Sequence, residues 1–138
     1  MEQAEIQAHQ STYEKEIKDQ LDIPLETLWQ DAPIEPNWGI KKNSDGKNTF
    51  WFWFGFKGHL AVTTKSQYIT SRLMTSANLS DSKVATPLLK KVEDQFPEHF
   101  TTAILDAGHD YEPIYRQLQG DQMGAVIPYN VRNEPLMP

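Results

Sequence analysis

The alternation of apolar and polar residues predicts a β-hairpin in the middle of the chain. The run NSDGKN at residues 43–48 is typical of a turn, because Asp-Gly flanked by Asn and Ser favours a tight reversal of the backbone. It separates a short strand at Trp38–Lys42 from a long strand at about Thr49–Thr63, and Tyr68–Thr75 alternates as an antiparallel partner would. The segment FWFWFGF within the long strand has no polar face. This predicts a strand that is central in its sheet or buried on both faces.

A helix is predicted to follow the hairpin. Ser80 is a good N-cap, and Asp81 suits the positive end of the first helical turn. An apolar stripe at helical spacing comes next, formed by Val84, Leu88, Leu89, Val92 and Phe96. Pro87 lies inside this stripe, which predicts either a kink or a helix that starts nearer Thr86.

The remaining pattern alternates strands with a second helix. Phe100–Leu105 is a short apolar strand, Asp110–Gln119 has the apolar spacing of a helix, and Gly124–Tyr129 is a last strand. The order strand, strand, helix, strand, helix, strand predicts an α/β fold with antiparallel and then parallel pairing.

The N-terminal 36 residues differ from the rest in charge. Residues 1–36 hold nine Asp or Glu and two Lys or Arg, a net charge of −7, whereas residues 37–138 hold ten and eleven, a net charge of +1. Residues 2–20 predict a polar helix with a thin apolar stripe, and 24–30 predict a second short helix. We interpret 1–36 as an acidic helical insertion or connector that packs loosely, because it has little apolar surface to bury.

Composition excludes several classes of protein. The chain has no cysteine, so disulfide frameworks and thiolate metal sites are excluded. Its first residues lack the charged and apolar regions of a signal peptide. The longest apolar run, Phe50–Phe54, is far too short to span a membrane. These features predict a soluble cytoplasmic protein without a membrane partner.

Lysines and aromatic residues are mixed around the long strand. Five lysines fall within one stretch that also contains the five aromatic residues of Phe50–Phe54. They are Lys41, Lys42, Lys47, Lys57 and Lys65. A basic and aromatic surface of this kind could face DNA phosphates, while the alternative is that these lysines are solvated and only flank a core strand.

Asp106 is the sharpest chemical feature of the sequence. It follows an apolar strand and precedes Ala107 and Gly108, which is where α/β sheets place their ligands. A carboxylate at this position would suit Mg²⁺, which prefers oxygen ligands. The alternative is that Asp106 caps the following turn. For Asp81 the same two roles apply, and its position after Ser80 favours capping.

Three further residues accompany these acids. Lys57 and His59 are two apart on a predicted strand, so their side chains share one face and could hold a phosphate, although His59 alone is typical of a structural histidine. His109 lies close enough to Asp106 to support it. The sequence contains no zinc motif, glycine-rich phosphate loop or serine-hydrolase motif.

Four blocks in order give the chain a specific resemblance. The blocks WGIKKNSDGKNTFWFWFGFKGHLAVTTKSQ, TSANLSDSKVATPLL, LDAGHDYEPIY and AVIPYNVRNEP resemble the middle of bacterial insertion-sequence transposases of the DDE type. The resemblance implies an incomplete RNase H-like α/β mixed sheet with flanking helices, in which 37–138 form a partial catalytic domain. In that family three acidic residues hold two Mg²⁺ ions for attack on a phosphodiester. Asp106 matches the second acid, as catalytic residue and metal ligand.

The resemblance also identifies what departs from the family. The first acid belongs to a strand upstream of these blocks, and the third, a Glu on a helix, lies beyond the RNEP block that contains Glu134. We therefore expect a transposase fragment that is inactive alone. Its expected partners are DNA at transposon ends, through Lys41, Lys42, Lys57 and His59, and a full-length transposase. The alternative is a non-catalytic α/β module for DNA binding or protein interaction.

Overall fold

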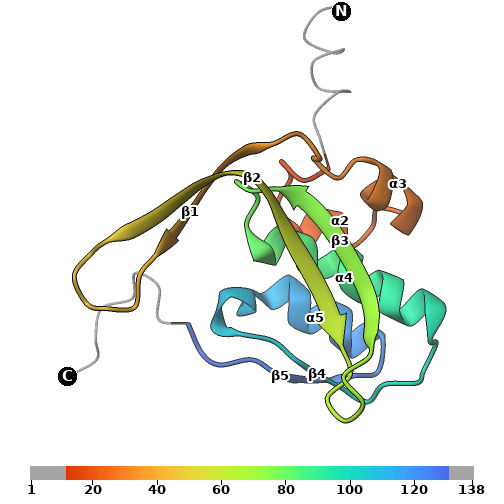
Figure 1. The fold of residues 1–138 in the computed structure, drawn as a ribbon. Helices are drawn as coiled ribbons and strands as arrows, with labels where there is room; N and C mark the ends of the chain where they lie inside the picture. The colour runs from red at the N-terminus through yellow and green to blue at the C-terminus, as the bar shows by residue number, and fades with distance from the viewer. Residues whose placement is uncertain (1–11, 131–138) are drawn as a thin grey trace, which may run out of the picture.

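The structure is a computed structural model that describes residues 12–130. Its central helix is α4 (Asp81–Gln95), which packs against strands of an antiparallel sheet and against the helices α2, α3 and α5. Figure 1 shows the hairpin of β2 and β3 crossing in front of α4, with the strands β4 and β5 below it. This is the α/β organisation predicted from the sequence, and it is consistent with an incomplete RNase H-like fold.

The antiparallel sheet contains β1 (Asn37–Lys42), β2 (Phe50–Val62) and β3 (Ile69–Ser76), in the order β1-β2-β3. The first half of β2 pairs with β1, with Lys42 opposite Phe50, and its second half pairs with β3, with Phe56 opposite Ser76. The β1–β2 hairpin therefore extends beyond the rest of the sheet as an arm (Figure 1). Both predicted hairpins are confirmed, and each strand lies within one or two residues of its predicted bounds.

The second sheet is parallel and has two short strands. β4 (Thr102–Ile104) pairs with β5 (Gly124–Val126), and the helix α5 (Glu112–Gly120) connects them. The predicted change from antiparallel to parallel pairing is confirmed. Within residues 12–130, however, the two kinds of pairing form separate sheets, and both parallel strands are shorter than the apolar runs that predicted them.

Two apolar clusters share the helix α4. Ala85 lies in a cluster with Ala103 of β4 and with Ile114 and Leu118 of α5. Val84 lies in the other, with Leu73 of β3 and the N-terminal residues Tyr13 and Ala32. The helix begins at Asp81 after the N-cap Ser80, as predicted, and continues through Pro87, so a start nearer Thr86 is wrong. Burial of Pro87 and its neighbours holds this segment helical despite the backbone hydrogen bond that proline cannot donate.

The N-terminal segment packs tightly, which contradicts the predicted loose packing for its described part, residues 12–36. The side chain of Leu28 in α3 (Leu25–Gln30) is completely buried, and the hydroxyl of buried Tyr13 donates to the Leu28 carbonyl at 2.6 Å. Burial raises the pKa of that hydroxyl. The prediction failed because the segment has few apolar residues but buries four of them, Tyr13, Ile17, Leu28 and Ala32, in the core. The rest of the helix predicted for 2–20 lies outside the described residues, and the division at residue 36 stays a prediction.

Lys90 of α4 joins this segment to the helix. Lys90 donates through Nζ to the carbonyls of Leu21 and Ile23, both at 2.7 Å, just after α2 (Ile17–Gln20) ends. These carbonyls have no partner within the short helix, so the ammonium group caps its C-terminal end. Partial burial lowers the pKa of Lys90.

The aromatic strand is exposed, so its predicted burial on both faces is wrong. Odd-numbered residues of β2 from Lys57 onward face α4, and even-numbered residues face away from it with no layer above them. In the arm, Trp53 covers Gly39, where an added Cβ would lie 2.3 Å from the indole, so only glycine fits. The strand is central in its three-stranded sheet, as the sequence predicted, but the face that it turns away from α4 is uncovered. Within residues 12–130, no helix is long and apolar enough to cross a membrane.

Candidate functional site

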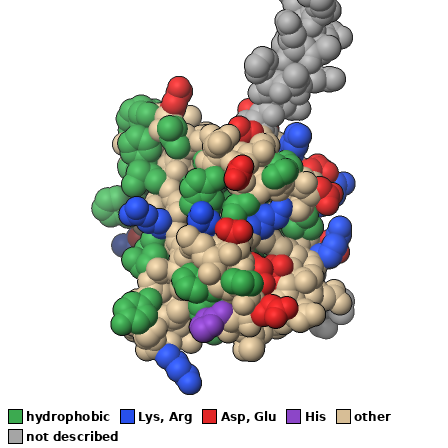
Figure 2. All heavy atoms as spheres, turned by 90° about the vertical axis from the view of Figure 1, so that its right-hand side faces the viewer, with side chains coloured by type: hydrophobic (Ala, Val, Ile, Leu, Met, Phe, Trp, Pro, Cys, Tyr) green, Lys and Arg blue, Asp and Glu red, His purple; other side chains and the backbone are tan. Residues whose placement is uncertain are grey.

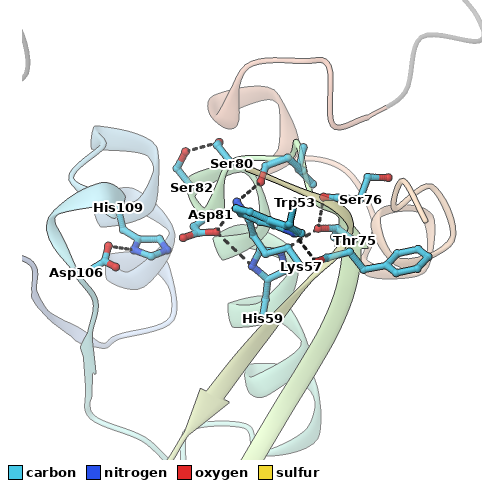
Figure 3. Close-up of polar contacts among 12 residues, drawn as sticks. Trp53, Lys57, His59, Thr75, Ser76, Ser80, Asp81, Ser82, Asp106 and His109 are labelled. Carbon is cyan, nitrogen blue, oxygen red and sulfur yellow. Dashed lines mark hydrogen bonds and ion pairs between the residues drawn. The ribbon is translucent and has the colours of Figure 1, made fainter. Parts of the chain in front are cut away.

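Three charged or titratable side chains converge where β2 meets the first turn of α4. Lys57 lies 3.4 Å from Asp81 through Nζ and Oδ1, and it also donates to the Leu79 carbonyl at 2.9 Å. His59 places Nδ1 3.7 Å from the same carboxylate oxygen. Figure 3 shows Lys57 and His59 pointing from the strand toward Asp81. We call these three residues the Asp81 cluster.

The charge of Asp81 is balanced by another member of the cluster. The His59 side chain is buried, and its Nε2 pairs with Thr75 Oγ1 at 2.9 Å. Burial lowers the pKa of His59, which Asp81 opposes and Lys57 reinforces, so the ring is uncharged at neutral pH. Lys57 is then the cation that balances Asp81. The predicted shared face of Lys57 and His59 is confirmed, and so is the structural character of His59.

The order Thr75, His59, Asp81 has the residue types of a nucleophile, a base and an orienting acid. The Thr75 hydroxyl, however, is completely buried and donates to the Ser76 carbonyl at 3.2 Å. A nucleophile must reach its substrate. The Asp81 cluster is therefore a structural network that fixes β2 against α4.

Asp106 lies in a more open setting. It follows β4 by two residues and is the N-cap of a 3-10 turn, Ala107–His109. Its Oδ1 accepts from the Gly108 amide at 3.0 Å and pairs with His109 Nδ1 at 2.9 Å. An added Cβ on Gly108 would lie 3.0 Å from that oxygen, so a larger residue here would displace the carboxylate slightly. We call Asp106 and His109 the Asp106 pair.

The two carboxylates differ more in their partners than in their exposure, because the Asp81 side chain is also 52% exposed. The side chain of Asp106 is 74% exposed, while that of His109 is 15% exposed. In Figure 3 the His109 ring lies between Asp106 and the Asp81 cluster. His109 thus orients Asp106 from the protein side and leaves the carboxylate open to solvent. The capping role is observed here, and it leaves room for a ligand.

The described residues do not supply a complete metal site. Between residues 12 and 130, no group of three His, Cys, Asp or Glu side chains is placed to hold a metal ion. Asp106 offers the oxygen chemistry that Mg²⁺ prefers, but a two-metal centre needs several carboxylates. Asp81 is paired with Lys57, and Glu134 lies outside the described residues. The donors present therefore do not fit the two-ion site of the resemblance.

Asp110 has a different role from the one expected. The sequence predicted a helix that begins at Asp110, but α5 begins at Glu112 with Tyr111 as its N-cap. The Asp110 carboxylate instead accepts from the Tyr115 hydroxyl at 2.9 Å and the Asn130 amide at 2.8 Å. The first of these bonds raises the pKa of Tyr115. Through these two hydrogen bonds, Asp110 links the segment after β5 to α5.

The lysines predicted to contact DNA fall into two groups. Lys41 and Lys42 are exposed on β1, and Lys47 is exposed in the turn of the arm. Lys57 has a side chain that is 26% exposed and already paired, and His59 is buried. The structure therefore brings Lys57 and His59 together with Asp81 and separates them from the lysines of the arm.

Sequence reasoning treated Asp81 mainly as a helix cap and so missed the Asp81 cluster. Two features of the sequence could have indicated it: the spacing of Lys57 and His59 on one strand face, and an acid at the start of the helix that packs on that strand. Ser80 does occupy the N-cap position, but its hydroxyl contacts Ser82 rather than the helix backbone.

The fold and the exposed carboxylate after β4 define an α/β domain that presents an acid where such sheets bind ligands. The chain belongs to the family described as Transposase DDE domain, whose model matches residues 7–135. Comparisons with curated proteins and with solved structures found no match. The family resemblance inferred from the four sequence blocks is therefore confirmed, and with it a role in transposition.

Proposed function

We propose that the chain is a partial DDE transposase domain in which Asp106 is the second acid of the family's metal site. The Asp106 pair carries this proposal: the carboxylate is exposed, held in one orientation by the Gly108 amide and His109, and adjacent to a parallel strand. Asp81 is a weaker candidate, because Lys57 already neutralises it.

We further propose that the 138-residue chain alone neither nicks nor joins DNA. Two-metal catalysis requires carboxylates that hold both ions about 3.5–4 Å apart. Among the described residues, Asp106 offers an oriented and exposed carboxylate, but no group of three potential ligands surrounds it. Because groups that act as one unit fail together, a partial set of ligands does not give a proportionate activity.

The test is cleavage of supercoiled plasmid carrying transposon ends, with Mn²⁺ and Mg²⁺ in parallel. We expect no nicked or joined product above buffer. Asp106→Asn is the diagnostic variant and Asp94→Asn, an exposed acid on α4, is the matched control. Cleavage by the purified chain that Asp106→Asn abolishes and Asp94→Asn retains would overturn the proposed inactivity while supporting the site.

DNA binding is proposed to use the arm. Lys41 and Lys42 lie on an exposed hairpin that also holds Lys47, and this placement suits contacts to phosphates. Lys57 and His59 are better suited to support Asp81 than to reach DNA, because their polar atoms are engaged inside the protein.

A titration against salt distinguishes these lysines. The double variant Lys41→Ala/Lys42→Ala should weaken DNA binding and lower the salt slope by about two, since each phosphate contact releases about one counterion. The control is Lys18→Ala/Lys65→Ala, which removes the same charge from exposed sites elsewhere. Equal losses in both variants would show that only net charge matters and that the arm is not the contact.

A specific observation favours the protein-interaction alternative as a second function. The arm and the sheet expose large aromatic and aliphatic side chains on the face away from α4. Apolar patches of this size mark interaction sites.

A further inference from the structure

The strand β3 lies at the edge of the antiparallel sheet, with β2 on one side and, within residues 12–130, no strand on the other. The amides at its end show which way its backbone faces. The Ala77 amide donates to a carbonyl of β2, whereas the Ser76 amide points to the opposite side and donates to the Pro33 carbonyl at 2.7 Å. Because amides alternate in direction along a strand, those of Met74 and Arg72 also point away from β2.

The open part of this edge is short. At one end, the amide and the hydroxyl of Ser76 are already bonded to the segment before β1. At the other end, the register between β2 and β3 shifts between Ala61 and Val62. Between these points, the outward amides and carbonyls of Arg72 and Met74 have no backbone partner among the described residues. Edge groups of this kind are a template on which another strand can pair.

A groove of about 480 Å³ lies against the open edge, and we call it the β3 groove. Its lining includes Ser71, which points toward α4, and Arg72, which is opposite the exposed Leu60 and points the other way. Because neighbours on a strand point to opposite faces, a groove that contacts both of them must lie at the edge of the strand. Its far wall is formed by Trp29 of α3 and Lys91 of α4. Figure 1 shows α3 and the C-terminal end of α4 beside β3.

The β3 groove is basic, although the net charge of the chain is −6. Arg72 and Lys91 line it, no described acid does, and neither cation forms an ion pair within residues 12–130. Lys91 instead lies over Trp29, with Nζ 5.4 Å from the ring centre. Figure 2 looks onto this side of the molecule and shows basic side chains across its middle, with hydrophobic side chains toward the left and acidic ones toward the right. The two cations are therefore available to an acidic ligand.

A further polar group in the groove lacks a partner. Ser71 is buried, and its hydroxyl has no hydrogen-bond partner among the described residues. Buried polar groups in proteins are normally hydrogen-bonded. A carbonyl or carboxylate that seats deep in the groove would give this hydroxyl an acceptor. The groove thus combines cations and a hydroxyl with a strand edge that offers both amides and carbonyls.

We propose that the β3 groove binds an extended acidic segment of a protein partner, which adds to β3 as a further strand. Backbone hydrogen bonds to Arg72 and Met74 would hold the segment, as in other cases of strand addition. Adjacent side chains of a strand point to opposite faces, so two consecutive acidic residues would meet Arg72 on one face and Lys91 on the other. DNA fits this edge less well, because a phosphate diester cannot donate to the strand carbonyls. The proposal goes beyond the role in transposition and does not depend on it.

The probe is a blocked, fluorescein-labelled octapeptide of alternating threonine and valine with two adjacent glutamates at its centre. Fluorescence anisotropy with the full chain at low salt should show saturable binding. The same peptide with glutamines in place of the glutamates should bind about tenfold more weakly, because it lacks the charges that face Arg72 and Lys91. In the complex, the amides of Arg72 and Met74 should exchange with deuterium more slowly than in the free chain.

Two N-methylated versions of the peptide distinguish strand pairing from ion pairing alone. One carries methyl groups on its odd-numbered amides and the other on its even-numbered amides. Because a strand directs alternate amides toward its neighbour, one version should lose binding and the other should retain it. Equal effects in the two versions would overturn the proposal, since the contact would then not use the edge of β3.

Arg72→Gln/Lys91→Gln is the diagnostic variant, and Lys41→Gln/Lys47→Gln is the control that removes the same charge from the arm. Circular dichroism checks that both variants fold. Affinity for the peptide should fall about tenfold in the first and stay within about twofold in the second. If the diagnostic variant does not fold, Lys91→Gln alone on α4 should give a smaller loss, and the N-methylated peptides still test the wild type.

Three results would overturn the proposal. They are a wild type without saturable peptide binding, equal losses in the two double variants, and duplex DNA that competes the peptide away from the wild type and binds less tightly only to Arg72→Gln/Lys91→Gln. The last result would assign the β3 groove to phosphate contacts instead.

Discussion

The Asp81 cluster and the Asp106 pair each contain a carboxylate, but the two carboxylates have different partners. Each contains a carboxylate and a histidine, and Figure 3 shows them as neighbours. Asp81 is balanced by Lys57 and backed by a buried, uncharged His59. Asp106 is oriented by His109 but remains 74% exposed. The difference shows that the presence of an acid and a histidine does not identify a functional site, whereas an oriented carboxylate that no lysine neutralises is a better candidate.

The largest effect on stability that tests this contrast is expected when the His59 ring is removed. His59→Ala should destabilise the fold by about 2 kcal/mol, because it opens a cavity and leaves Thr75 without its partner. His109→Ala should cost less than about 1 kcal/mol, since its bond goes to an exposed carboxylate. Chemical denaturation of both variants gives the comparison. Equal losses would mean that the Asp106 pair is as structural as the Asp81 cluster.

A smaller effect on the stability of the fold is expected when the pH is lowered. The pKa of His59 is lower in the folded protein than in the unfolded chain, where it is about 6.5. The unfolded chain therefore binds more protons between the two values, and stability should fall as pH drops below about 6.5 toward the folded pKa. Above pH 7 this contribution is complete and constant.

Denaturant midpoints between pH 5 and 8 measure this contribution. His59→Gln, which cannot titrate, should remove the pH-dependent loss, while His99→Gln on an exposed loop should retain it. An unchanged profile in His59→Gln would show that another group is responsible.

The smallest effect on stability is expected at Asp106. Asp106→Asn should change the free energy of unfolding by less than about 0.5 kcal/mol, because the side chain is exposed and the amide oxygen can still accept from Gly108. The same variant should abolish the weak Mn²⁺ binding that one carboxylate provides. Calorimetric titration of the wild type and the variant tests the assignment, and unaltered binding in Asp106→Asn would show that Asp106 is not the ligand.

Much of the fold follows from patterns that are local in the sequence. The turn at 43–48, the N-cap Ser80 and the apolar spacing around Ile114 and Leu118 each depend on neighbouring residues, and each was predicted. Asp106 was also predicted to follow a strand, because a strand end and a glycine are visible in the sequence.

The failures concern contacts between distant residues. The exposure of Phe52 depends on which elements cover β2, and an apolar run does not reveal that. The packing of Tyr13 against Leu28 and Leu73 likewise depends on the tertiary arrangement. The balance of Asp81 by Lys57 joins residues that are 24 positions apart. Local patterns therefore located the candidate acids but did not show which of them a lysine neutralises.

The strand β2 has a consequence for folding fidelity. A slip of one residue in a β-sheet moves every side chain to the opposite face. In β2 such a slip would bury Phe56 and Leu60 against α4 and expose Lys57 and His59 to water. Hydrophobic burial alone would therefore favour the wrong alignment. Specific contacts must therefore favour the correct alignment. They are the packing of Trp53 over Gly39 and the polar contacts of His59 and Lys57. The polar contacts of the Asp81 cluster thus disfavour a competing misaligned pairing of β2.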